Sequence, residues 1–259
     1  MQLVELLITT YGKTRQEILE ILEGIQLRSN CIIRNQTNAS GQEKININGY
    51  EVTIINAVDK GLSKNRNELL KLSDAEYVMF CDDDSVFVDD YIREIEKAKS
   101  QKHDGIIFNV LSLNNNRPLK QIKHNKICNS FFEISSNGIC GLIIKKSFLL
   151  NNNLWFEERI GSGTDYPCGE DSLFLKAVLK CGGRIVLNKK TLLTVSQQSS
   201  LWYQDIIDEK LLLTKGIVYK QLYGNLWAIF ALRFISHNRK RIGVSKPFSI
   251  IKRGTKISF

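Results

Sequence analysis

Three consecutive acids, Asp82, Asp83 and Asp84, follow the apolar segment 77–81. That segment has the composition of a buried strand, so the carboxylates stand at its carboxyl end. Adjacent carboxylates repel one another and are costly to hold together without a cation. A divalent ion such as Mg²⁺ or Mn²⁺ that also binds phosphate oxygens would remove this cost. The cluster therefore predicts a metal and phosphate site, with a solvated acidic turn as the alternative.

A second acidic pair, Glu170 and Asp171, follows a loop that contains Gly161 and Gly163. From Asp171 the apolar positions fit a helix that ends at 182–183, which puts both acids in its first turn. The helix dipole favours carboxylates there, so capping alone can explain one of them. The other has the chemistry to take a proton from an incoming hydroxyl group.

Together these two acidic sites describe one type of reaction. A metal that bridges a diphosphate would stabilise the charge on a departing nucleoside diphosphate. A separate carboxylate would deprotonate the attacking alcohol. The residues therefore predict group transfer from a nucleotide-activated donor to a hydroxyl group.

Alternating strands and helices indicate how these acids are positioned. The predicted strands of the first half are 3–9, 31–33, 50–57 and 77–81. The predicted helices are 14–25 behind a Thr14 capping box, 63–72 with Ser63 as cap and Leu69, Leu70 and Leu72 turned inward, and 91–99. This order predicts an α/β fold with a mostly parallel sheet and helices on both faces.

Ligands of such sheets bind beyond the carboxyl ends of the strands. Thr10, Tyr11 and Asn35 are expected there, beside the aspartates. The second half is less regular. We expect strands at 105–110, 138–144, 184–187 and 192–195, and a long helix from about 203 to 223.

Positive charge is concentrated in the last fifty residues. Residues 1–209 contain 25 bases and all 27 acids, whereas residues 210–259 contain eleven bases and no acid. The apolar run 226–232 in this tail is well short of the roughly 20 residues that cross a bilayer. An interfacial helix with a basic patch and an ordinary core helix both fit the run. We expect an anionic membrane surface, and no nucleic acid, as partner because few aromatic residues accompany the bases.

The cysteine pattern favours a reducing compartment. Six cysteines stand far apart without a Cys-x-x-Cys pair and three histidines are scattered, so neither a disulfide framework nor a zinc site is expected. The N-terminus has no basic leader ahead of an apolar stretch. We therefore expect a cytoplasmic protein that is peripheral at the inner face of the plasma membrane.

Four motifs resemble one family. Thr10-Tyr11, the segment 61–67, the three aspartates and the segment 169–175 resemble, in this order, family 2 glycosyltransferases, especially bacterial capsule and O-antigen enzymes. The resemblance implies a GT-A, Rossmann-like domain at 1–200, with a nucleotide-binding half at 1–110 and an acceptor half at 111–200. Residues 201–259 would form a helical basic extension.

The resemblance also implies roles on the donor side. Thr10, Tyr11 and Asn35 would line the nucleoside pocket of a nucleotide-diphosphate sugar, a UDP-sugar first of all. Asp82 would face the ribose or the metal, Asp83 would bind the nucleotide sugar with it, and Asp84 would be the principal ligand of Mn²⁺ or Mg²⁺. Arg66 would lie near the nucleotide, with a surface helix base as the alternative reading.

On the acceptor side, the resemblance makes Asp171 the base that deprotonates the acceptor hydroxyl. Glu170 would bind acceptor or order the loop. The family inverts the anomeric configuration in one displacement, so one base is enough. The expected acceptor is a glycan or lipid-linked glycan in bacterial surface polysaccharide synthesis. Trp155 and Trp202 are candidates for stacking on a sugar or for the core.

Two departures from the family keep other readings open. Asn35-Gln36 stands where Asp-Asp is common, and Ser196-Gln197 stands where a histidine is common, so Gln197 is a candidate replacement at the metal site. A catalytically weak nucleotide-sugar-binding module therefore remains possible. A nucleotidyltransferase is the other alternative, although Thr10-Tyr11-Gly12-Lys13 is a poor version of its glycine-rich loop.

Overall fold

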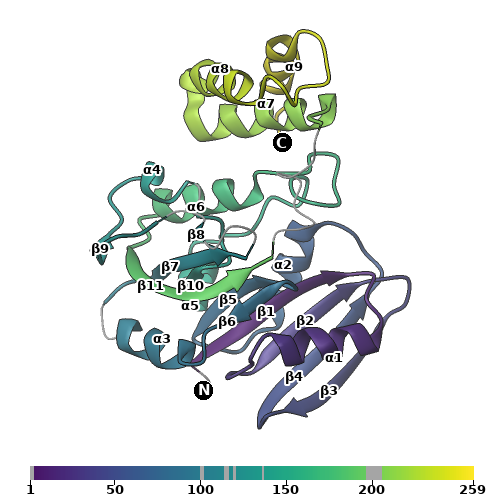
Figure 1. Cartoon of the computed structure of the whole chain (residues 1–259), viewed down its shortest axis with the longest axis vertical. Helices are drawn as coiled ribbons and strands as arrows, with labels where there is room; N and C mark the ends of the chain where they lie inside the picture. The colour runs from purple at the N-terminus through teal and green to yellow at the C-terminus, as the bar shows by residue number, and fades with distance from the viewer. Residues whose placement is uncertain (1–2, 100–101, 114–116, 119–120, 136, 197–205) are drawn as a thin grey trace.

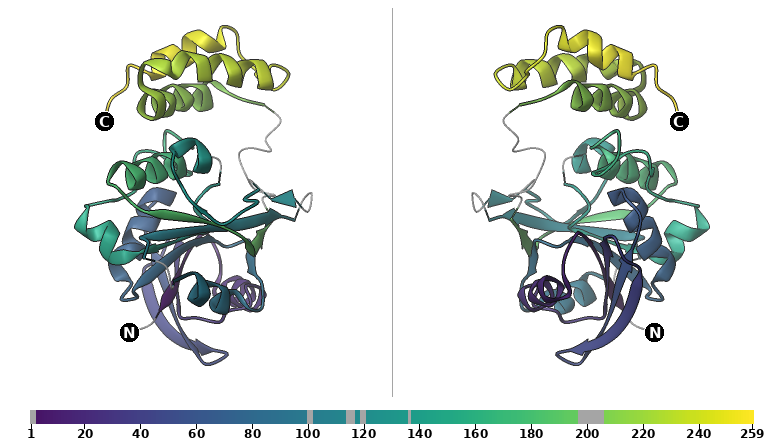
Figure 2. Two further views of the ribbon diagram at one scale, coloured as in Figure 1. Left: turned by 90° about the vertical axis from the view of Figure 1, so that its left-hand side faces the viewer. Right: turned by 90° about the vertical axis from the view of Figure 1, so that its right-hand side faces the viewer.

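The computed structural model describes residues 3–99, 102–113, 117–118, 121–135, 137–196 and 206–259. An α/β body built around one sheet carries a layer of C-terminal helices at one end (Figures 1 and 2). The prediction of an α/β fold with a helical C-terminal extension is confirmed.

The strands of the body combine parallel and antiparallel neighbours. They are β1 (Val4–Tyr11), β2 (Cys31–Gln36), β3 (Gly41–Ile47), β4 (Tyr50–Ala57), β5 (Tyr77–Asp82), β6 (Ser85–Phe87), β7 (Gly105–Ser112), β8 (Arg117–Pro118), β9 (Lys126–Ile127), β10 (Leu142–Lys145) and β11 (Ile185–Val195). The main path runs β3-β4-β2-β1-β5-β10-β7-β11-β6. Strands β4, β2, β1 and β5 are parallel neighbours, and β10 lies antiparallel between β5 and β7.

Helices cover both faces of this sheet. Those of the body are α1 (Arg15–Gly24), α2 (Leu62–Leu72), α3 (Tyr91–Lys99), α4 (Phe131–Ile134), α5 (Lys146–Asn151) and α6 (Glu170–Lys180). Successive β1 side chains point to opposite faces, so Leu6 packs with α1 and α3 while Leu7 packs with α2, α5 and α6. The two hydrophobic layers leave the carboxyl edge of the parallel strands for polar side chains.

Most of the predicted first half is confirmed, with a correction at α2. Thr14 forms the predicted capping box with Glu17. Ser63 is not the cap of α2, because Gly61 holds that position with a φ of 103°. The Ser63 hydroxyl instead donates to the Ile160 carbonyl at 2.5 Å. Leu72 does not turn inward and is 47% exposed.

The second half differs from its prediction at three places. Of the predicted strand 138–144, only residues 142–144 are extended; they belong to β10, which runs antiparallel to β5. The two predicted strands 184–187 and 192–195 are one strand, β11, with a register shift between Asn188 and Thr191. The predicted helix from about 203 begins at Glu209, after the Asp208 cap. Residues 203–205 lie outside the described part.

The C-terminal helices are α7 (Glu209–Tyr223), α8 (Trp227–Asn238) and α9 (Pro247–Gly254), with the 3₁₀ turn η2 (Gly224–Leu226) between the first two. Helices α7 and α9 cross at Gly216 and Gly254, where a Cβ atom on Gly216 would lie 2.0 Å from the Ile251 carbonyl oxygen. Leu212, Ala231 and Ile251 are buried among them. Among the helices that the structure describes, none is long and apolar enough to cross a membrane.

Candidate active site

A cleft of about 1540 Å³ opens at the carboxyl ends of β1 and β5. Thr10 and Tyr11 line it from the end of β1, and Asp82, Asp83 and Asp84 line it from the end of β5. Parallel pairing places Thr9 opposite Asp82, which aligns the two strand ends. Glu170 and Asp171 line the same cleft from the first turn of α6. The two acidic sites predicted from sequence therefore share one cavity.

Arg66 links the two acidic sites. Its Nη1 donates to Asp171 Oδ1 at 2.8 Å, and its Nη2 donates to Asp82 Oδ1 at 3.2 Å. Nη1 also lies 3.8 Å from Glu170 Oε1. The side chain is 2% exposed, so the alternative reading of Arg66 as a surface base is wrong.

The setting of Arg66 keeps it charged. Burial lowers its pKa, but Asp171, Asp82 and Glu170 outweigh burial and the pKa is raised overall. The Phe156 ring lies 5.5 Å from the guanidinium carbon. Nε of Arg66 has no hydrogen-bond partner among the described residues. A buried cation with three carboxylates around it is costly to form and costly to break.

Glu170 and Asp171 are crowded into the start of α6. Burial raises the pKa of Glu170 to about 7, with a further rise from Asp171 that Arg66 opposes. Burial also raises the pKa of Asp171, against the lowering effect of Arg66. Oε2 of Glu170 is buried without a hydrogen-bond partner in the described ranges. This pair can therefore hold or release a proton near neutral pH.

A glycine permits the α6 start to meet α7. Gly169 caps α6 with a φ of 106°, and a Cβ atom there would lie 2.5 Å from Val218 Cγ2. Only glycine combines that backbone conformation with that closeness. Helix α7 is thus seated directly on the segment that carries the two acids.

The aspartate cluster is held by neighbours on both sides. The Thr9 hydroxyl donates to Asp82 Oδ1 at 3.4 Å, and the Thr10 hydroxyl donates to Asp83 Oδ2 at 2.5 Å. The Cys140 thiol lies 3.3 Å from Asp82 Oδ2 as a hydrogen-bond donor. Burial, with a contribution from Asp82, raises the pKa of Cys140 well above its usual range, which keeps the thiol protonated. No pattern in the sequence points to Cys140.

The carboxylates at the end of β5 suit a divalent cation that also binds a substrate. Within the described ranges, no group of three or more histidine, cysteine or acidic side chains forms a metal cage. Mg²⁺ is commonly held by one or two carboxylates together with substrate phosphates and water. Asp82 and Asp84 line the cleft and supply carboxylates of this kind.

Asn35 lies behind the cleft wall, outside its lining. Its Nδ2 donates to the Lys13 carbonyl at 2.7 Å and to Asn56 Oδ1 at 2.9 Å, and its Oδ1 accepts from the Lys13 amide at 3.1 Å. These bonds hold the turn that follows β1. Its neighbour Gln36, in contrast, does line the cleft.

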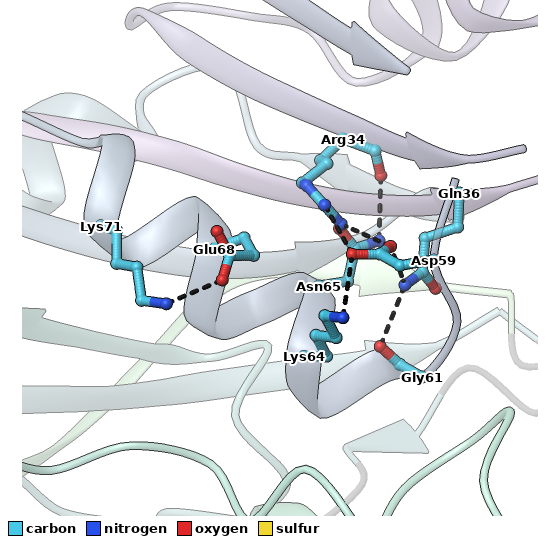
Figure 3. Close-up of polar contacts among 8 residues, drawn as sticks. All are labelled: Arg34, Gln36, Asp59, Gly61, Lys64, Asn65, Glu68 and Lys71. Carbon is cyan, nitrogen blue, oxygen red and sulfur yellow. Dashed lines mark hydrogen bonds and ion pairs between the residues drawn. The ribbon is translucent and has the colours of Figure 1, made fainter. Parts of the chain in front are cut away.

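A polar network fixes the loop between β4 and α2, as Figure 3 shows. Arg34 donates to both carboxylate oxygens of Asp59, at 3.0 and 2.8 Å, and to Asn65 Oδ1 at 2.9 Å. Gln36 donates to Asp59 and to the Gly61 carbonyl. This network sets the first turn of α2, and Arg66 follows in the next residues. Sequence reasoning missed it because its members are spread over three elements.

Helix α7 forms a wall of the cleft that sequence reasoning also missed. Lys215, Val218, Tyr219, Leu222 and Tyr223 line the cleft from one side of the helix. Their spacing of three and four residues is the signal that could have found this face.

The remaining sequence candidates lie elsewhere. Trp155 donates to Asn153 and packs on the hydrophobic layer that contains Phe156, and it is not among the residues that line the cleft. Trp202 and Gln197 lie outside the described residues. All six cysteines are described and none forms a disulfide.

Residues 8–163 match the profile of Glycosyl transferase family 2. A crystal structure of S. aureus TarS 1-349 aligns with 92% of this chain and 73% of its own, at a TM-score of 0.64 and 16% identity. The same S. aureus fragment in complex with UDP-GlcNAc aligns with 92% of this chain and 73% of its own, at a TM-score of 0.61 and 17% identity. At these identities the likeness shows a shared fold. A search among curated protein sequences finds no match.

Proposed function

Because the chain belongs to glycosyl transferase family 2, we propose that its cleft moves a sugar from a nucleotide-diphosphate sugar to a hydroxyl group of a glycan. One observation carries the proposal: Arg66 joins Asp82 on β5 to Asp171 on α6 within one cavity. The charged Arg66 side chain lies between the two acids. It therefore connects the end of the cleft proposed for the sugar donor with the end proposed for the acceptor. The TarS structure with UDP-GlcNAc supports a UDP-sugar as donor.

On the donor side, Thr10, Tyr11 and Gln36 contact the nucleoside, and Asn35 acts from behind by holding the turn at Lys13. Asp82 and Asp84 would hold Mn²⁺ or Mg²⁺ at the donor end of the cleft. When bound, the cation supplies charge stabilisation for the departing nucleoside diphosphate. Asp83, bonded to Thr10, keeps the strand-end turn in shape.

On the acceptor side, Asp171 takes the proton of the acceptor hydroxyl. The acceptor oxygen forms a bond to the anomeric carbon while the bond from that carbon to the β-phosphate oxygen breaks. A single displacement inverts the anomeric configuration. Glu170 has a raised pKa and therefore determines how many protons it and Asp171 together hold at a given pH.

The acceptor of this proposal is a lipid-linked glycan at the cytoplasmic face of a bacterial plasma membrane, in the synthesis of a capsule or O-antigen type polysaccharide. The basic residues after Glu209 support this setting because they favour an anionic surface. The six free cysteines are in keeping with a reducing compartment.

An assay with a panel of nucleotide sugars, Mn²⁺ or Mg²⁺ and a lipid-linked acceptor tests the proposal. We expect release of nucleoside diphosphate with at least one donor, and faster release when acceptor is present. Pyrophosphate as product would instead identify a nucleotidyltransferase. Tight donor binding without any turnover would identify a binding module. If no donor binds or is consumed, the proposal is rejected.

A further inference from the structure

Apolar side chains are exposed on α8 and on Leu226, the last residue of the η2 turn before it. Leu226, Ile229 and Leu232 are spaced three residues apart and are 57, 61 and 57% exposed. Phe132 of α4 is 60% exposed, and its ring lies 6.2 Å from that of Phe230 on α8. We call these four residues the apolar patch. A soluble surface scatters such side chains singly, whereas a contiguous set marks an interaction site.

The charged side chains that follow the apolar patch along α8 and the rest of the chain are all basic. Arg233 follows Leu232 directly, and Arg239 and Lys240 follow the end of α8, all three exposed. The 50 residues from 210 to the end contain eleven bases and no acid. On α4, Glu133 is paired with Lys126. Apolar side chains bordered by basic side chains are the features of a helix that lies in the headgroup region of an anionic bilayer.

We propose that the apolar patch docks into the surface of an anionic lipid bilayer. Leu226, Ile229 and Leu232 enter the boundary between headgroups and acyl chains, and Arg233, Arg239 and Lys240 contact the lipid phosphates. A second copy of this chain is a poorer occupant, because two tails of the same charge repel one another.

The apolar patch is joined to the cleft by a row of rings. Tyr223 lines the cleft, and its ring stacks on Phe230 with centroids 3.4 Å apart and planes 7° apart. The Phe132 ring lies 6.1 Å from that of Tyr223 and nearly parallel to it. A membrane at the patch would therefore lie beside the α7 wall of the cleft. Resting on the proposed function, this arrangement brings the sugar end of a lipid-linked acceptor to Asp171.

Vesicle sedimentation tests the docking. Wild-type protein should sediment with vesicles that contain phosphatidylglycerol, and less with vesicles of phosphatidylcholine alone. The triple variant L226Q/I229Q/L232Q should lose affinity for the anionic vesicles by about tenfold or more. Since all three side chains are exposed, the fold should persist, which circular dichroism checks. Leu150→Gln, at an exposed leucine of α5, is the matched control and should sediment as wild type does.

Equal sedimentation of the wild type and the triple variant would overturn the docking proposal. A wild-type dimer that the triple variant dissociates, without vesicle binding, would overturn it in favour of a second copy. Arg239→Gln with Lys240→Gln should weaken binding only at low salt, because lipid charge is screened at high salt.

Donor hydrolysis in solution separates this proposal from the proposed function. The triple variant should hydrolyse donor as wild type does, but should transfer sugar more slowly to an acceptor embedded in vesicles. If wild type neither hydrolyses any donor nor transfers sugar to an acceptor while the sedimentation results hold, the function fails and the docking stands. If hydrolysis holds and sedimentation is unaffected by the triple variant, the docking fails alone.

Discussion

The Arg66 guanidinium donates a 2.8 Å hydrogen bond to the carboxylate of Asp171, a residue 105 positions later in the chain. The same guanidinium donates to Asp82, so one buried cation neutralises acids from a strand end and from a helix start. The side chain of Arg66 on α2 therefore joins polar groups of β5 and α6, in addition to the hydrophobic layer that packs these three elements.

Arg66→Met should destabilise the fold strongly. The change leaves Asp82, Glu170 and Asp171 without their cation, and an uncompensated buried charge costs about 3–5 kcal/mol. Chemical denaturation measures the change in free energy of unfolding. Arg15→Met removes an exposed pair with Glu43 and is the control, with an expected cost of at most about 1 kcal/mol. Similar losses in both variants would contradict the role assigned to Arg66.

Asp171→Asn should abolish sugar transfer and leave nucleotide binding in place. Loss of a general base typically lowers kcat by about 10²–10⁴-fold, and the amide keeps the shape of the side chain. Steady-state kinetics and calorimetric titration with UDP measure the two effects. An unchanged kcat would show that another group accepts the proton.

The rate should rise with pH through about 7, because the pair must release a proton before it can accept one from the acceptor, and Glu170 has its pKa raised to about 7. The pH profile of kcat/KM measures this rise. Glu170→Gln should shift the rise to lower pH, since it removes one of two interacting carboxylates. A profile that is identical in wild type and variant would count against coupling within the pair.

The free energy of unfolding should fall as pH rises, whereas the rate should increase. Because the folded-state pKa of Glu170 lies above its usual 4.5, the folded protein binds more protons than the unfolded chain between about 4.5 and about 7. The contribution of Glu170 to stability is therefore lost as pH rises through that window. Denaturation at pH 5 and pH 8 should show a smaller loss in Glu170→Gln than in wild type.

Gly169→Ala should lower both stability and activity. The new methyl group would meet Val218 at 2.5 Å and push α7 away from the start of α6. Gly182→Ala is a matched control, because Gly182 also has a positive φ but open space around it. The control should cost about 1–2 kcal/mol of stability, because an L-residue is strained at positive φ, and should keep its kcat/KM. If the two variants behave alike, the contact between α7 and α6 does not matter to the site.

Asp84→Asn should weaken UDP binding in Mn²⁺ but leave binding in EDTA little changed. The amide is a poorer ligand for a divalent cation, so the part of the affinity that depends on metal is lost. Titration calorimetry under both conditions gives the comparison. Glu96→Gln, an exposed residue on α3, is the control and should not alter either affinity. Equal binding of wild type with and without metal would contradict the metal assignment.

Local patterns predicted the parts of the site that depend on one element at a time. The apolar run before Asp82 defined β5, and the periodicity after Asp171 defined α6. The Thr14 capping box defined the start of α1. Strand β3 was not predicted, because its alternating polar residues at an exposed edge carry a weak hydrophobic signal.

Asn35 and Arg66 show why the sequence could not predict the remaining contacts of the site. As a motif residue, Asn35 was expected to face the nucleotide, but its amide is used by the backbone of Lys13. Arg66 fitted a surface helix equally well until its carboxylate partners were known. In both cases the interacting residue lies in another part of the fold, and no local pattern in the sequence identifies it.

By its own residues, the chain determined which chemical groups stand at strand ends and helix starts, because backbone periodicity and capping act over a few neighbouring positions. Only the tertiary structure decided that Arg66 bridges Asp82 and Asp171, that the Cys140 thiol bonds Asp82, and that α7 walls the cleft. Those contacts join residues far apart in the chain. They are set by how the sheet and helices pack, because burying apolar faces fixes where the polar edges meet.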